Sequence, residues 1–206
     1  MLQTISADKI TLYDLEQRFG LMESDESAFF EEWQTDLPVL TRVEIDRLVR
    51  VRTAYNNLAR RSVLESTVKL AVVSPLLDLS GLFFPPFYVT TEEEVEVIMD
   101  SHDLVVRGRM DVLVLKEQFW VLVIESKRAE LSLKVGIPQV LAYMLGTPQP
   151  DRPMYGLVTN GSNFVFLKLE QRDVPTFDRS REFMLETDDD LEIVLQIMKR
   201  LAERSL

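Results

Sequence analysis

Residues 108–146 read GRMDVLVLKEQFWVLVIESKRAELSLKVGIPQVLAYMLG, and this stretch decides the fold. Two almost wholly apolar runs, 112–115 and 119–124, are typical of strands that are covered on both faces at the centre of a sheet. The short polar segment 116–118 between them predicts an antiparallel hairpin. A helix should follow, because Pro138 suits a first helical turn and Gly146 suits a helix end.

Charged side chains flank the two apolar runs. Asp111 precedes the first run and Glu125 follows the second, so pairing of the hairpin would place them on neighbouring strands. Glu125 and Lys127 are two residues apart and therefore point to the same side of an extended chain. Burying carboxylates together costs several kcal/mol unless a cation or protons neutralise them. The stretch therefore predicts a cation-binding site inside an otherwise apolar region.

The residue types at this site indicate a reaction. Acidic, oxygen-rich sites with open positions suit Mg²⁺ or Mn²⁺, which keep bound waters and accept phosphate oxygens. A lysine beside such an ion can stabilise developing negative charge, or help to orient and deprotonate an attacking water. We expect hydrolysis of a phosphodiester.

Composition sets the outer limits. The chain has 206 residues, of which 46% are hydrophobic, which is ample for a packed core. No apolar run approaches the length of a membrane span, and the N-terminus does not have the pattern of a signal peptide. The absence of cysteine excludes disulfides and thiolate metal sites, and the single histidine, His102, falls in a predicted turn at 100–103. The cytoplasm is the expected location.

The charge balance opposes a nucleic-acid partner. Thirty-four acidic against 23 basic residues give a net charge of −11, which disfavours non-specific binding to DNA or RNA. The predicted helix 43–61 is locally basic, with Arg47, Arg50, Asn57 and Arg61 on one side. This side is either an ordinary solvated face or a phosphate-contacting ridge, and the two interpretations are about equally supported.

A second predicted helix, 63–79, carries Glu65 on the same mostly apolar face as Val68 and Val72. Glu65 either forms an ion pair with Lys69, worth about 0.2–0.5 kcal/mol at this spacing, or serves the predicted site. Spacing alone slightly favours the ion pair. Gln139 and Tyr143 are neighbours on one face of the later helix, where half-buried polar residues are common.

The rest of the chain supplies supporting elements. Weakly helical pieces at 12–19 and 28–33 indicate a peripheral layer, and 88–91, 94–99 and 104–106 are candidate strands. A turn signal at 160–163 predicts a hairpin of 154–159 with 164–169, and 173–181 reads as a loop. A final helix should follow residues 188–190, with a buried stripe of Leu191, Val194, Leu195, Met198 and Leu201.

The order of these pieces resembles the PD-(D/E)xK nuclease superfamily, and more narrowly the nuclease domain at the N-terminus of type I restriction enzyme R subunits. The matching pieces lie within residues 62–170: Glu65 before Ser74-Pro75-Leu76-Leu77, Gly108-Arg109-Met110-Asp111, Glu125-Ser126-Lys127, Gln139 with Tyr143, and Thr159-Asn160-Gly161. Met110 stands where the superfamily name has proline. The phosphate-binding Gly-x-x-x-x-Gly-Lys loop of a motor does not occur in this sequence.

This resemblance implies an α/β fold with a restriction-endonuclease-like core, a central mixed sheet flanked by helices. The core would span residues 62–206, and residues 1–61 would form an N-terminal helical extension packed on it. The resemblance also implies a role for each matching residue. Asp111 and Glu125 would hold Mg²⁺ or Mn²⁺, with Glu65 completing the metal site and Lys127 as the catalytic lysine. Gln139 and Tyr143 would position DNA, and Arg109 is a further expected substrate contact.

The implied function is a Mg²⁺-dependent deoxyribonuclease that cuts internally. Its expected partners are DNA, a separate motor or targeting protein, and a second copy of the chain, because double-strand cutting needs two sites. The alternative is a catalytically inactive nuclease-fold module for binding or scaffolding, which the net charge favours. Retention of Asp111, Glu125 and Lys127 together favours the enzyme. A metal enzyme acting on a small molecule is a third, weaker interpretation, because the sequence has no Gly-rich cofactor loop.

Overall fold

The computed structural model describes residues 3–99 and 104–205, in which nine strands form one mixed sheet. The strands are β1 (Gln3–Ser6), β2 (Met22–Glu23), β3 (Phe87–Met99), β4 (Leu104–Lys116), β5 (Phe119–Ser126), β6 (Met154–Thr159), β7 (Asn163–Gln171), β8 (Pro175–Arg179) and β9 (Phe183–Met184). They run in the order β1-β4-β5-β6-β7-β8-β2, with β3 beside β4 and β9 beside β7. The predicted turn at 100–103, with His102, lies outside the described residues.

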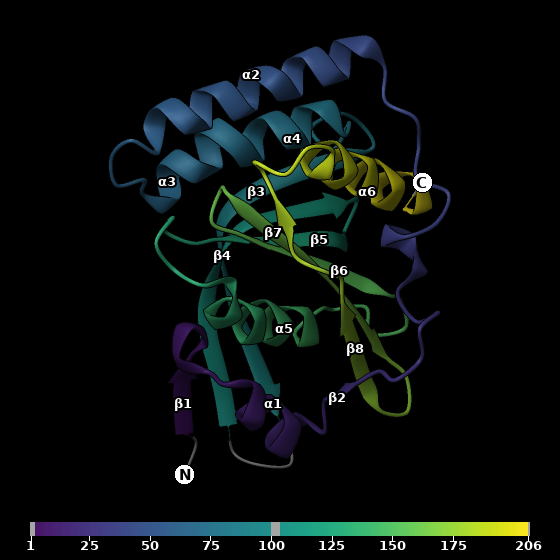
Figure 1. Ribbon diagram of the computed structural model, residues 1–206. Coiled ribbons are helices and arrows are strands. Elements are labelled where there is room, and N and C mark those ends of the chain that lie inside the picture. The colour runs from purple at the N-terminus through teal and green to yellow at the C-terminus, as the bar shows by residue number, and fades with distance from the viewer. Residues whose placement is uncertain (1–2, 100–103, 206) are drawn as a thin grey trace.

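Helices cover both faces of the sheet, as the sequence predicted (Figure 1). One layer consists of α1 (Leu12–Phe19) and α5 (Ile137–Leu145), and the other of α2 (Arg42–Leu58), α3 (Glu65–Val68), α4 (Ser74–Leu79) and α6 (Asp190–Arg204). Each layer encloses its own apolar core against the sheet. Among the described residues, no helix combines the length and the apolar character that crossing a membrane requires.

The predicted central hairpin is confirmed. β4 and β5 pair antiparallel from Val112 opposite Ile124 to Lys116 opposite Phe119. β5 and β6 are parallel, and α5 forms the crossover connection that parallel neighbours need. The hairpin of β6 with β7 and the buried stripe of α6 are confirmed as well.

One edge of β4 is shared between two strands. β1 pairs with β4 up to Arg107, and β5 begins to pair at Val112. Tyr143 of α5 reaches the segment between them, where its hydroxyl donates to the carbonyl of Arg109 at 3.1 Å. A Cβ on Gly108 would lie 2.7 Å from the Tyr143 ring, so this close approach requires glycine. The change of partner strand leaves Asp111 next to the start of the β5 pairing.

Three expectations for short elements are corrected. Residues expected in a peripheral helical layer supply β1 and β2, which pair in parallel with β4 and β8. The expected helix at 28–33 is reduced to a 3₁₀ turn, Glu31–Trp33, and the expected loop 173–181 contains β8. Short edge strands carry little alternation of their own, so their tertiary partners decide them. The division of the chain at residue 61 stays a prediction.

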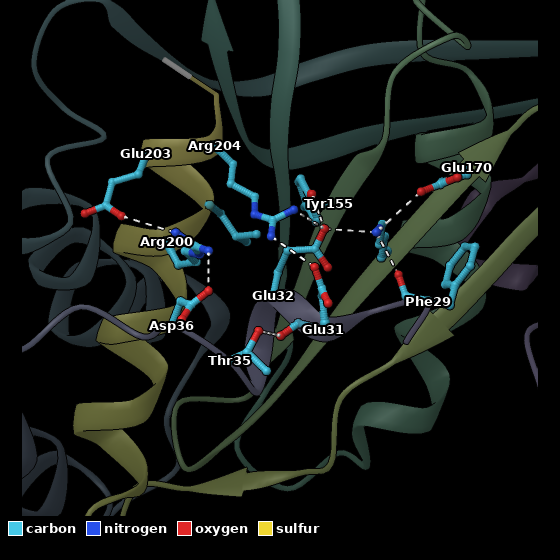
Figure 2. Close-up of polar contacts among 12 residues, drawn as sticks. Phe29, Glu31, Glu32, Thr35, Asp36, Tyr155, Glu170, Arg200, Glu203 and Arg204 are labelled. Atoms are coloured by element: carbon cyan, nitrogen blue, oxygen red, sulfur yellow. Dashed lines mark hydrogen bonds and ion pairs between the residues drawn. The ribbon is translucent and has the colours of Figure 1, made fainter. Parts of the chain in front are cut away.

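A buried polar cluster ties the 3₁₀ turn to the sheet and to α6 (Figure 2). Oε1 of Glu32, whose residue is 1% exposed, accepts from the hydroxyl of Tyr155 at 2.9 Å and from Nζ of Lys168 at 2.9 Å. Arg204 adds a third donor at 3.4 Å. Burial alone would raise the pKa of Glu32, but the bonds from Lys168 and Tyr155 outweigh it and lower the pKa below its ordinary value.

Candidate active site

The structure brings Asp111, Glu125 and Lys127 together. Oδ2 of Asp111 accepts from both the backbone N–H and the hydroxyl of Ser126, each at 2.7 Å, which fixes the Asp111 carboxylate beside the end of β5. Nζ of Lys127 donates to Oε1 of Glu125 at 2.9 Å. Glu125 and Lys127 therefore share one side of the chain, as their two-residue spacing predicted.

Lys127 is held by a chain of buried hydrogen bonds. Its Nζ donates to Oε1 of Gln139 at 2.6 Å, and Nε2 of Gln139 donates to the hydroxyl of Tyr143 at 2.8 Å. Gln139 is 6% exposed and Tyr143 is 1% exposed, and burial raises the pKa of Tyr143 well above its usual range. In this structure both residues position Lys127. Their expected contact with DNA stays a prediction.

Glu125 is the electrostatically unusual member of the site. It is 5% exposed, and burial, followed by the negative charges of Asp111 and Glu65, raises its pKa to about 7 against the opposing effect of Lys127. Its Oε2 atom is buried and has no hydrogen-bond partner among the described residues. A buried oxygen without a donor is costly, and the like charges of Asp111 and Glu65 add to that cost here, so this carboxylate is suited to bind a proton or a cation.

Glu65 opens α3 next to the carboxylates. It lines a cavity of about 390 Å³ together with Asp111 and Arg128. No ion pair in the described part of the chain joins Glu65 to Lys69, so the i,i+4 interpretation is wrong. Lys69 instead lies between Oε1 of Glu92 at 2.6 Å and Oδ1 of Asp111 at 2.9 Å. The cavity makes Asp111 accessible from solvent.

The sequence did not identify three contributors to this site. Ser126 lies inside the recognised Glu-x-Lys motif, and its position next to Glu125 is a signal that could have identified it. Lys69 was considered only as a partner of Glu65. Glu92 had no signal, because it is the first of three successive glutamates and falls between the predicted strands 88–91 and 94–99.

Two hydrogen bonds connect the segment after α2 with the loop after β5. The hydroxyl of Ser62 donates to Glu130 at 2.8 Å, and the N–H of Ala129 donates to the carbonyl of Val63 at 3.4 Å. These bonds attach the segment after α2, which carries Arg60 and Arg61, to the loop that follows Lys127 and Arg128.

Arg47, Arg50 and Asn57 of α2 are solvent-exposed. Arg61, which was predicted on the same helical side, is exposed too but lies beyond the end of α2 at Leu58. Arg109, the other expected substrate contact, is largely exposed and lies 3.6 Å from Oε2 of Glu92. Contact of these residues with substrate stays a prediction.

The donor set fits a divalent cation that keeps much of its water. No group of three or more His, Cys, Asp or Glu side chains in the described part of the chain forms a ready-made metal site. Mg²⁺ commonly binds through one or two carboxylates, with water and substrate phosphate completing its shell. Asp111 and Glu125 provide two carboxylates, and the unpartnered Oε2 of Glu125 is a free ligand atom. Glu65 as a third ligand stays a prediction.

No family model matches this chain, and no curated protein matches it. Among solved structures, the chain is similar to one described as a fragment of an HsdR subunit of a type I restriction enzyme from Vibrio vulnificus YJ016. The two share 23% sequence identity with a TM-score of 0.41, and the match covers 69% of this chain and 26% of that one. That match carries no argument about function, so any functional proposal rests on the side chains of this chain itself.

Proposed function

We propose that this protein is a Mg²⁺- or Mn²⁺-dependent nuclease that hydrolyses DNA phosphodiester bonds. The observation that carries the proposal is the buried Glu125, with an unpartnered oxygen, beside Asp111 and Lys127. Buried carboxylates are unfavourable in a folded protein unless positive charge neutralises them, and a divalent cation with a phosphodiester would engage both carboxylates and the lysine.

Each side chain has a role that its contacts support. Asp111 and Glu125 would hold the cation, which when bound neutralises their charge and polarises a phosphate oxygen. Lys127 is already oriented by Glu125 and Gln139, so its ammonium needs no reorganisation to orient a water or to stabilise charge on the phosphate. The cavity beside Asp111 and Glu65 would give a backbone phosphate access from solvent.

DNA affinity needs local positive charge, because the chain as a whole carries a net charge of −11. Arg60 and Arg61 lie five and four residues before Glu65, and Arg128 directly follows Lys127. We propose that they contact the DNA backbone, with further affinity supplied by a separate motor or targeting protein. A second copy of the chain would be required for double-strand cutting.

The test is cleavage of single- and double-stranded DNA by the purified protein with Mg²⁺, Mn²⁺ or EDTA. Asp111→Asn, Glu125→Gln and Lys127→Met should each lower the cleavage rate by about 100-fold or more, because each removes a group that acts on the transition state. Asp173→Asn and Lys9→Met make the same chemical changes at exposed positions and should leave the rate unchanged. Cleavage that is indifferent to all three site substitutions would overturn the proposal.

A catalytically inactive DNA-binding or scaffold module is the second candidate. The observation that favours it is the ammonium of Lys69, which already lies 2.9 Å from Asp111 and supplies positive charge from within the protein. Calorimetric titration with Mn²⁺ separates the two candidates. A protein that binds DNA, takes up no Mn²⁺ and leaves DNA intact would be the inactive module.

A further inference from the structure

Lys69 lies in an irregular helical segment between α3 and α4. Between α3 and α4 (Figure 1) the chain forms a π-helical segment, Lys69–Val73, in which the N–H of Ser74 donates to the carbonyl of Lys69, five residues back. Single π-helical turns inside α-helices occur frequently at functional sites. Lys69, the first residue of this turn, directs its ammonium to Glu92 and Asp111.

Glu92 is the second local distortion at the same place. In the β3–β4 ribbon, Thr91 pairs with Val112 and Glu93 pairs with Met110, so Glu92 and Asp111 face each other between these pairs. Glu92 has a φ of +57°, a backbone conformation that L-residues rarely adopt. The other two non-glycine residues with positive φ in the described ranges, Asp36 and Glu117, lie outside strands. Unusual backbone of this kind is concentrated at functional sites.

We propose that Lys69 is the internal counter-ion of the site: it holds Asp111 in the metal-free protein and remains on Glu92 when a divalent cation binds. The inference rests on the proposed metal-dependent function. Oδ2 of Asp111 accepts two hydrogen bonds from Ser126, so Oδ1 is the oxygen that a cation could bind. In this structure Oδ1 accepts a hydrogen bond from Lys69 instead. Because Lys69 is already shared with Glu92, its transfer requires the loss of only one bond.

This arrangement makes Lys69 and Glu92 positioning residues with opposite effects on metal affinity. Removing the ammonium frees Oδ1 of Asp111, so the metal should bind more tightly. Removing the Glu92 carboxylate leaves the ammonium on Asp111 alone, so the metal should bind more weakly. In a protein without Lys69 there is no ammonium for Glu92 to hold, so substitution of Glu92 should leave the metal affinity unchanged. Simple long-range electrostatics predicts additive effects instead.

The experiment is calorimetric titration of Mn²⁺ into the wild type, Lys69→Met, Glu92→Gln and the double variant, all checked for folding by circular dichroism. Lys69→Met should lower the Kd for Mn²⁺ by about tenfold and Glu92→Gln should raise it by about tenfold, the range typical for groups that orient metal ligands. The double variant should bind like Lys69→Met. Lys69→Gln is the substitute if Lys69→Met does not fold, and Arg109→Gln is the control for charge removal next to Glu92.

Thermal melting in EDTA supplies a second readout. Metal-free Lys69→Met should melt at a lower temperature than the wild type, because Asp111 and Glu92 lose their shared counter-ion, and saturating Mn²⁺ should remove that difference. If Glu92→Gln weakens binding equally with and without Lys69, Glu92 does not act as the acceptor and the inference is overturned. If Mn²⁺ binds and DNA is cut with no dependence on Lys69, the inference fails while the proposed function stands. If none of the four proteins binds Mn²⁺, the proposed function itself fails.

Discussion

Two buried glutamates of this protein, Glu32 and Glu125, each accept a hydrogen bond from a lysine at 2.9 Å, yet their pKa values shift in opposite directions. They lie at opposite ends of β5: the cavity beside Glu32 is lined by Phe119 at its start, and Glu125 is near its last residue. The distance to the lysine therefore does not decide the direction in which the pKa of the carboxylate shifts.

The difference lies in the remaining neighbours. Glu32 accepts from Tyr155 and Arg204 in addition to Lys168, so its charged form is well stabilised and ties three elements together. Glu125 has Lys127 as its donor and the negative charges of Asp111 and Glu65 nearby. Oε2 is buried without a hydrogen-bond partner in both residues, so the difference lies at Oε1 and in the nearby charge. Oε1 of Glu32 accepts from three donors, which stabilises the charged form, whereas Glu125 has one donor with like charge beside it and is suited to binding.

The largest effect on stability is expected when the polar cluster around Glu32 is disrupted. Glu32→Gln should lower the free energy of unfolding by about 3 kcal/mol, because it removes the nearer carboxylate from the buried ammonium of Lys168 and leaves it Glu170 at 3.4 Å. Urea unfolding followed by circular dichroism measures this change. Glu32→Gln combined with Lys168→Met should recover part of the loss. A loss equal to that of an exposed substitution such as Asp173→Asn would show that Glu32 does not stabilise the fold.

The matched substitution at Glu125 should change the free energy of unfolding in the opposite direction. In EDTA at pH 8, Glu125→Gln should raise the free energy of unfolding by about 1 kcal/mol, because it removes a charge that burial and Asp111 disfavour. The same variant should be inactive in DNA cleavage. Parallel urea titrations of both variants provide the measurement, and a loss of stability as large as that of Glu32→Gln would contradict the comparison.

Acid should remove the contribution of Glu32 to the free energy of unfolding. Its pKa in the folded protein is lowered from the ordinary value of 4.5, so its contribution to stability is fully present above that value and is lost as the pH falls through the lowered pKa. The difference in unfolding free energy between wild type and Glu32→Gln should therefore be constant from pH 8 to pH 5 and shrink at lower pH. A difference that grows as the pH falls would show that the pKa of Glu32 is raised in the folded protein rather than lowered.

The smallest effect concerns DNA. If the Glu125 end of the sheet binds DNA, Arg60→Gln and Arg61→Gln should each reduce the slope of log affinity against log salt by about 1, without changing sequence preference. Arg152, which lies at the Glu32 end, is the matched control. Fluorescence anisotropy with a labelled duplex at several salt concentrations measures the slopes. Equal changes for Arg61→Gln and Arg152→Gln would remove the distinction between the two ends.

The sequence by itself determined the central hairpin, the helix that follows it and the approach of Asp111, Glu125 and Lys127. These features follow from local rules. Continuous apolar runs predict central strands, a short polar turn predicts the hairpin, and the two-residue repeat of a strand places Glu125 and Lys127 on one side. The Gln139 and Tyr143 pair was identified by helical spacing, although their hydrogen bonds to Lys127 and Arg109 were not predicted.

Only the tertiary structure decided which partners the other charges would take. Lys69 bonds to Asp111, 42 residues away, and not to Glu65 one turn before it, and Glu32 bonds to Lys168, 136 residues away. The edge strands β1, β2 and β8 were missed for the same reason. Local periodicity constrains only residues that are close in sequence, whereas pairing between distant segments depends on how whole helices and strands pack. The same packing gave Oε1 of Glu32 three donors and Oε1 of Glu125 one donor beside like charge.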